Sequence, residues 1–159
     1  MFEHYLTNSM VGIINSKQAL KNYQLTNIKS LKNTSAYHIQ QSYEYLIKYL
    51  IYNNANYNKG INKETSIKQI FSHNLDLLIK NFCIPNGIAV PYKLVKNAKL
   101  YTSWEAESRY RIGFSVRLDS LKKAIKTAEE WLLLIKPTYK QKLVSVNKRL
   151  KLDKAVISS

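Results

Sequence analysis

The sequence predicts an all-α protein, an antiparallel up-and-down bundle of about five helices. Glycine and proline are scarce, four and three in 159 residues, which is too few for the many tight turns of a β-protein. Apolar residues recur at steps of three and four over several long stretches, which is the period of a helix with one buried face. The connections between these stretches are short, and short connections join antiparallel neighbours in a bundle.

The first helix is predicted over about residues 2–28, from an imperfect apolar stripe. The polar stretch over residues 29–35 then reads as a break between helices. Thr34 or Ser35 is expected to cap the following helix, because a hydroxyl oxygen accepts from the free backbone N–H groups of a first turn.

The second helix, about residues 36–52, has the most regular apolar face in the chain. Its opposite side carries a polar stripe of Gln41, Glu44 and Lys48. Glu44 precedes Lys48 by four residues, the order and spacing that favour a helical ion pair. This stripe must meet water, a partner, or polar groups of another helix.

A loop is expected after residue 52, followed by a third helix over about residues 64–82. A break near Ser72 is expected inside it, because the next residues read as a fresh helix start. Pro85 and Gly87 should end this helix, since both residues interrupt helical structure.

A fourth helix is expected to begin at Pro91 and to run towards Trp104. A fifth should begin at Asp119 or Ser120 and end before Pro137. The expected domain organisation is therefore a helical bundle over residues 1–136. Residues 137–159 form a basic C-terminal extension, either a short helix that frays or one that docks on a partner.

The formal net charge of +15 is the largest signal in the composition. Such a charge attracts polyanions at long range, which means either nucleic acid or an acidic protein. The single Cys83 excludes an intramolecular disulfide and a cysteine-based zinc site.

No signal peptide and no long apolar run is evident, so a cytoplasmic protein with no membrane contact is expected. Glu129 and Glu130 are adjacent on a predicted helix and should point in different directions, so they do not suggest a metal site. The glycines form no phosphate-cradling loop. We therefore expect neither a metal nor a cofactor.

The stretch TSWEAESRYRIGF, residues 102–114, holds half of the arginines, although only four of the 25 basic residues are arginine. Arg109 and Arg111 lie two residues apart, just after Glu105 and Glu107. The planar fork of arginine grips carboxylates and phosphates at two points, which lysine cannot do. Two interpretations stand: an anion site, or a structural ion pair with one of the glutamates.

Four short stretches, in this order along the chain, together resemble a known family. AYHIQQSYEYLIK resembles its second-helix signature, which is matched here by Gln40, Gln41, Glu44 and Lys48. FSHNLDLLI resembles the element that opens its third helix, with His73 at the head. LYTSWEAESRYR resembles the Ser-Arg-Tyr element after its fourth helix, and LKKAIKTAEEWL resembles its last core helix. Over about residues 20–135 the chain thus resembles the HEPN domain family.

This resemblance implies a helical bundle, usually a two-fold homodimer, with a link to nucleotides or RNA. Many members act beside a nucleotidyltransferase partner in toxin–antitoxin or defence pairs, and others are ribonucleases. Nuclease members carry an arginine followed, after four to six residues, by a histidine. The histidines here are at positions 4, 38 and 73, and every arginine comes later. We therefore expect a non-catalytic module; the alternative is a ribonuclease with a non-standard set such as His73 with Arg109.

The residues expected to bind nucleotide or another anion are Lys48, His73, Arg109, Tyr110 and Arg111. Gln41 and Glu44 are expected to line a structural polar cleft, with Glu44 paired to Arg109. Three of these residues have an alternative role. His73 would cap a helix or form an interhelical hydrogen bond, and Lys48 and Glu44 would belong to a solvated helix face. Tyr110 and Trp104 are candidates for stacking on a base, although Trp104 suits the core better. His38 is expected to be a partly buried structural residue.

Overall fold

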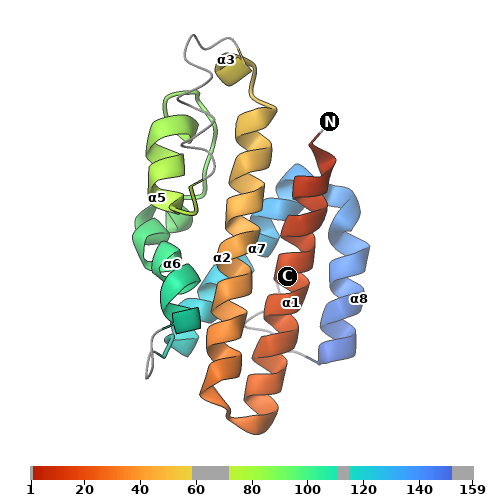
Figure 1. The fold of residues 1–159 in the computed structure, drawn as a ribbon. Helices are drawn as coiled ribbons and strands as arrows, with labels where there is room; N and C mark the ends of the chain where they lie inside the picture. Colours follow the sequence, from red (N-terminus) through yellow and green to blue (C-terminus); the bar gives the residue numbers. More distant parts are fainter. Residues whose placement is uncertain (1, 59–71, 111–114, 152–159) are drawn as a thin grey trace.

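The computed structural model describes residues 2–58, 72–110 and 115–151, and these form helices and connecting turns with no strand among them (Figure 1). The helices are α1 (Glu3–Thr26), α2 (Lys29–Tyr52), α3 (Ala55–Asn58), α5 (Leu75–Leu78), α6 (Tyr92–Tyr110), α7 (Leu118–Ile135) and α8 (Lys140–Leu150). A π-helical turn, η1 (Ile79–Cys83), continues α5, and a 3₁₀ turn, η2 (Pro137–Tyr139), precedes α8. The predicted all-α bundle is confirmed.

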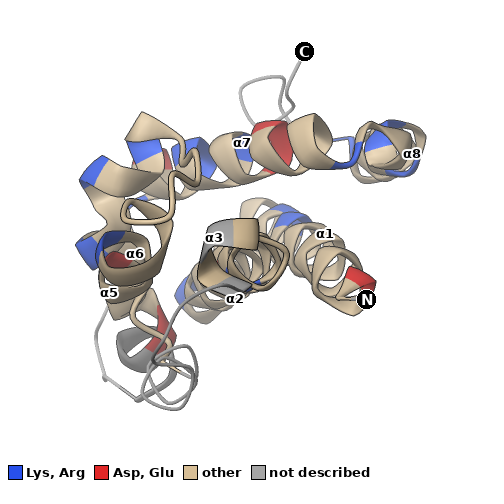
Figure 2. Ribbon diagram, turned by 90° about the horizontal axis from the view of Figure 1, so that it is seen from above, with Lys and Arg blue, Asp and Glu red and all other residues tan. Residues whose placement is uncertain are grey.

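The antiparallel pair of α1 and α2 lies at the centre of the arrangement (Figure 1). α7 crosses behind both helices, α5 and α6 lie on the far side of α2, and α8 lies beside α1 (Figures 1 and 2). The core between them is apolar and contains Tyr43, whose hydroxyl donates to the Ala124 carbonyl at 2.6 Å. α2 packs on this core, and it also contacts the start of α5, where the candidate site lies.

The predicted break over residues 29–35 is wrong, because α2 begins at Lys29. The turn between α1 and α2 is tight: Asn27 adopts a left-handed conformation (φ 59°) and Ile28 is extended. The polar residues that suggested a loop belong to the helix instead, and three of them, Lys32, Asn33 and Ser35, are buried. Ser35 is fully buried and bonds to Ser16 of α1, so it does not cap a helix.

Two reciprocal serine pairs hold α1 against α2. The Ser16 hydroxyl donates to the Ser35 carbonyl at 2.8 Å, and the Ser35 hydroxyl donates to the Ser16 carbonyl at 2.7 Å. Ser9 and Ser42 repeat this arrangement at 3.0 and 2.8 Å. Between the two pairs, a Cβ added to Gly12 would lie 3.0 Å from the His38 carbonyl oxygen. Small residues therefore let the two backbones approach closely.

The predicted fresh start after Ser72 is confirmed, since α5 begins there with an Asn74 cap that accepts from Leu77 N at 3.1 Å. The earlier part of the predicted third helix lies outside the described residues. Gly87 ends the segment in a left-handed conformation (φ 69°), as expected from the Pro-Asn-Gly turn. α6 continues past Trp104 to Tyr110, and α7 begins at Leu118 and ends before Pro137.

The segment after Pro137 forms η2 and α8, and α8 buries Leu143, Val146 and Leu150. A buried charged cluster fixes it to the bundle. The Lys17 ammonium of α1 donates to Glu129 Oε2 of α7 at 2.5 Å and to Asn147 Oδ1 of α8 at 2.6 Å. Burial lowers the pKa of the Lys17 ammonium, and the pairing with Glu129 opposes this shift. Residues 152–159 lie outside the described part of the chain.

Candidate functional site

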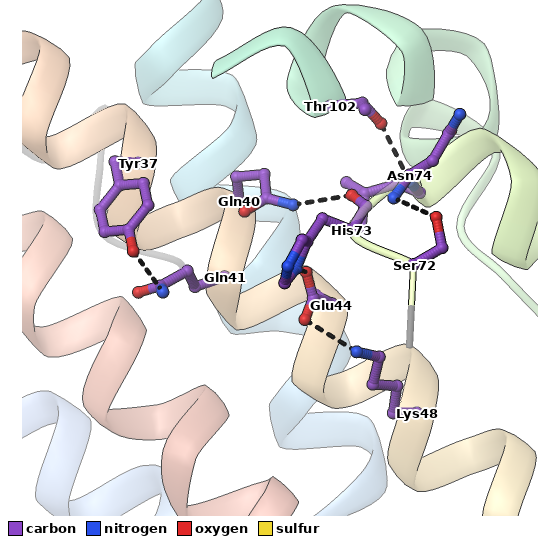
Figure 3. A network of polar contacts seen from close by, with 10 residues as sticks. Tyr37, Gln40, Gln41, Glu44, Lys48, Ser72, His73, Asn74 and Thr102 are labelled. Carbon is purple, nitrogen blue, oxygen red and sulfur yellow. Dashed lines mark hydrogen bonds and ion pairs between the residues drawn. The ribbon is translucent and has the colours of Figure 1, made fainter. Parts of the chain in front are cut away.

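Glu44 of α2 contacts both Lys48 and His73, between α2 and the start of α5 (Figure 3). Its Oε2 accepts from Lys48 Nζ at 2.9 Å, and its Oε1 lies 2.7 Å from His73 Nδ1. Glu44 and Lys48 are 7% and 8% exposed, so this is not a solvated helix face. The structure thus brings together three of the residues that the sequence singled out.

His73 is held at its backbone by neighbouring helices. Gln40 of α2, which is fully buried, donates from Nε2 to the His73 carbonyl at 3.1 Å. One residue further on, Asn74 caps α5. From α6, Thr102 accepts from Leu75 N at 2.9 Å (Figure 3). The backbone around His73 is therefore fixed from both sides, by α2 and by α6.

The contact with Glu44 determines which nitrogen of the neutral imidazole ring carries the proton. An ionised carboxylate only accepts hydrogen bonds, so Nδ1 must carry the proton that is shared with Glu44. In the neutral ring Nε2 is then an acceptor, and in the charged ring it is a second donor. The His73 side chain is 64% exposed. The imidazole is thus oriented by the protein and remains accessible to a ligand.

Gln41 does not take part in this network. Its Nε2 donates to the Tyr37 hydroxyl at 2.7 Å, one helical turn earlier on α2 (Figure 3). His38 is partly buried, as expected, and burial lowers the pKa of its imidazole. Of the two neighbouring glutamines, Gln40 is therefore the one that bonds to the turn carrying His73, whereas the hydrogen bond described for Gln41 stays within α2.

The side chains of Arg109 and Tyr110, and the whole of Arg111, lie outside the part of the chain that the structure describes. The expected pair between Glu44 and Arg109 lies outside it too; the partners described for Glu44 are Lys48 and His73.

Two described contacts bracket this arginine segment. Thr102 contacts the start of α5 near Gln40, and Val116 N donates to the buried Asn33 Oδ1 of α2 at 3.1 Å. The described residues on either side of the arginine segment thus bond to α5 and to α2, respectively.

Two other expectations concern stacking and metal binding. Trp104 is 1% exposed and packs in the core, its ring centroid 4.7 Å from that of Tyr101. Glu129 is buried whereas the adjacent Glu130 is exposed, so the two carboxylates do point in different directions. Within the described residues, no three histidine, cysteine or acidic side chains are grouped as a metal site would require.

Sequence reasoning missed several residues that build this part of the molecule. Thr102 and Asn74 were not predicted to fix the turn that carries His73. Lys17 was also missed, although its position gave a signal: it lies four residues after Ile13 and three before Leu20, both fully buried. A lysine in register with an apolar stripe suggests a buried partner.

A groove of about 470 Å³ lies between α7 and α8, lined mainly by apolar side chains that include Leu134 and Val144. Leu134 is 80% exposed. None of the residues that the sequence proposed for anion binding lies in this groove. It is therefore a separate surface feature.

Within the described ranges, no helix combines the length and the hydropathy that a membrane span requires. Searches of curated proteins and of solved structures found no match. The model of the HEPN domain family matches residues 14–137, from the middle of α1 to the end of α7. This match covers more than half of the 159 residues and includes His73 and the Glu44–Lys48 pair. The chain therefore belongs to the HEPN domain family.

Proposed function

We propose that this HEPN domain is a non-catalytic module that binds nucleotide or RNA. The proposed binding is supported by the distribution of charged residues over the helices. Exposed lysines gather on α6 and α8, whereas α1 and α2 carry few exposed charged residues (Figure 2). On α6, Lys93, Lys96 and Lys99 recur every three residues and are all exposed, so they form one cationic stripe. Such a stripe suits a phosphate backbone.

The Glu44–Lys48–His73 cluster adds a positioned donor to this surface. Glu44 offsets the charge of Lys48, so within the cluster His73 is the group that can donate to an anion. We include Arg109, Arg111 and Tyr110 in the proposed anion site on the strength of the sequence alone, because the arginine fork grips phosphate at two points.

The proposal that the module is non-catalytic rests on the missing arginine-to-histidine spacing of the nuclease members. A nucleotidyltransferase partner, in a toxin–antitoxin or defence pair, would suit such a module. An acidic protein surface would be attracted to the same lysine stripe as RNA.

A second candidate is a ribonuclease, and the hydrogen bond between Glu44 and His73 favours it. A carboxylate that holds Nδ1–H leaves Nε2 free to take a proton from a 2′-hydroxyl. Arg109 would then have to stabilise the charge that develops on the phosphate. The two candidates differ in one outcome, which is whether RNA is cleaved.

The test incubates purified protein with end-labelled single-stranded RNA at low salt and measures both filter retention and RNA length. The non-catalytic proposal predicts retained and intact RNA. RNA that the wild type cleaves and His73→Gln leaves intact would establish the ribonuclease. If the filter retains no RNA, the proposed partner of the positively charged surface becomes an acidic protein instead.

Thermal melts separate the roles of the two arginines. Arg111→Ala should reduce the rise in melting temperature on addition of RNA while leaving the melting temperature of the free protein nearly unchanged. Arg109→Ala should lower the melting temperature of the free protein as well, and Arg109→Lys should not restore it, because lysine lacks the fork. Equal and small effects would mean that neither arginine has a special role.

A further inference from the structure

The groove between α7 and α8 exposes apolar side chains to solvent. Leu134 of α7 is 80% exposed and Val144 of α8 is 39% exposed, and both line the groove of about 470 Å³. Val144 also lines a second depression of about 310 Å³, which continues the groove along α8. The two depressions together are called the α7–α8 groove. Exposed apolar side chains along a concave surface favour a partner that covers them.

Lysines flank the apolar part of this groove on α8. Lys140 and Lys148 line it, are exposed, and lie four residues before and four residues after Val144. Residues at steps of four share one side of a helix, so α8 presents a lysine, an apolar residue and a second lysine along one line. Eight residues span about 12 Å of helix. An exposed carboxylate, Glu130, also lines the groove, but it belongs to the α7 wall.

Buried contacts hold the two walls of the groove together. Glu129 of α7 lines the groove and accepts from Lys17 of α1, and Lys17 also donates to Asn147 of α8. Leu143 of α8 is fully buried in the apolar core. The groove is therefore formed before a partner binds, so a partner does not have to supply the free energy of ordering it.

The α7–α8 groove is separate from the surface proposed to bind RNA. The family match ends at residue 137, whereas α8 begins at Lys140. Figure 2 shows α8 on the other side of the molecule from α5 and α6, and therefore away from the lysine stripe of α6. A function of this groove is thus additional to the proposed binding of nucleotide or RNA, and it does not depend on that binding.

We propose that the α7–α8 groove binds an acidic amphipathic helix of a partner protein. A helix that lies in an apolar groove inserts side chains at steps of three and four residues. Apolar side chains of the partner cover Leu134 and Val144, and its carboxylates, about 12 Å apart, pair with Lys140 and Lys148.

Two other occupants fit this groove less well. RNA would meet apolar side chains between the two lysines, and these cannot donate to phosphate. A second copy of this chain carries the same net charge of +15 and would bring lysines towards lysines. An acidic helix satisfies both the apolar and the basic part of the groove.

The test measures the fluorescence anisotropy of a labelled synthetic helix of about 16 residues, with leucines at steps of three and four and glutamates on either side of them. The full-length chain should bind this helix saturably, at micromolar concentration and low salt. Leu134→Ser should weaken the binding about tenfold, because it removes an apolar side chain that the helix covers. Leu25→Ser is the matched control, since Leu25 is 71% exposed on α1 and lines neither depression.

A second pair of variants tests the lysines of the groove. Lys140→Gln combined with Lys148→Gln should weaken the binding about threefold or more and flatten its salt dependence. Lys96→Gln combined with Lys99→Gln removes the same amount of positive charge from α6 and should have a smaller effect. All four lysines are exposed, so both double variants should keep the helical circular dichroism of the wild type.

The inference is overturned if the wild type does not bind the synthetic helix, or if a peptide of the same composition without the apolar stripe binds equally well. It is also overturned if each groove variant binds as its control does. Leu134→Ser should leave both the filter retention of RNA and the molar mass in light scattering as in the wild type. A loss of RNA retention would instead assign the groove to RNA, and a halved molar mass would assign it to a contact between copies.

Discussion

His73 Nδ1 lies 2.7 Å from Glu44 Oε1, and this contact joins the turn before α5 to the middle of α2. Glu44 binds Lys48 with its other oxygen, so one mostly buried carboxylate contacts both an ammonium group and an imidazole ring. The ring nitrogen that remains is available at the surface. The burial of Lys48 and the orientation of the His73 ring therefore depend on the same carboxylate.

Replacing Glu44 should destabilise the fold. Glu44→Gln removes the anion that pairs with the mostly buried Lys48, and we expect the free energy of unfolding to fall by about 2 kcal/mol. Asp119→Asn is the matched control, because Asp119 and Lys123 form an exposed pair with the same four-residue spacing. It should cost less than about 0.5 kcal/mol. Urea unfolding measures both values, and equal losses would contradict the role given to burial.

Breaking the buried Lys17–Glu129–Asn147 cluster, which fixes α8, should lower the free energy of unfolding more than Glu44→Gln does. Lys17→Met leaves the Glu129 carboxylate buried without its ammonium, and we expect a loss of about 3–5 kcal/mol in urea unfolding. The double variant Lys17→Met with Glu129→Leu should recover much of this loss, because two apolar side chains need no pairing. If the losses of the two single variants simply add in the double variant, then the two charges are not coupled.

The close approach of α1 and α2 can be tested at Gly12. An alanine Cβ would lie 3.0 Å from both the His38 carbonyl oxygen and Ser42 Cβ, so the helices would have to separate. Overpacking costs about 1–3 kcal/mol, and the higher helix propensity of alanine returns about 1 kcal/mol. We expect Gly12→Ala to be destabilising by about 1 kcal/mol in urea unfolding. Asn15→Ala, at an exposed position of α1, should be neutral, and a stabilising Gly12→Ala would refute the tight contact.

Alkaline pH should destabilise the protein through two buried acids. Burial raises the pKa of the Cys83 thiol from 9.0 to about 12 and that of the Tyr101 hydroxyl from 10.0 to about 12. The unfolded chain releases these protons at lower pH than the folded chain does. The stability they contribute is thus complete below pH 9 and is lost as the pH rises towards 12.

Unfolding measured at several pH values should show this decline, and Cys83→Ala should make it smaller. In the native state Cys83 should also resist thiol reagents at pH 8, since little thiolate forms there. A thiol that reacts as fast in the folded protein as in urea would contradict its burial.

The sequence predicted the long helices well, because their apolar residues follow one period and Pro137 marks a clear end. It failed at residues 29–35, a polar stretch that resembles a loop, because the helix buries three of its polar side chains and Ser35 bonds across to α1. For the site, the four-residue spacing predicted the Glu44–Lys48 pair. The contact of His73 with Glu44 and the hydrogen bonds made by Gln40 and Thr102 were not predicted, because each joins residues that lie 27 to 33 positions apart. The Asn74 cap is local, and it belongs to the helix start that the sequence did predict.

The lysine-rich surface is central to the account, and the salt dependence of RNA binding tests it most directly. Filter retention of labelled single-stranded RNA is titrated against salt for the wild type and for Lys93→Gln, Lys96→Gln and Lys99→Gln combined. Each contacted phosphate contributes about 0.7 to the log–log slope, so the triple variant should have a slope flatter by about 2, with the RNA intact throughout. No retention of RNA by the wild type at low salt, or an unchanged slope in the triple variant, would contradict the account.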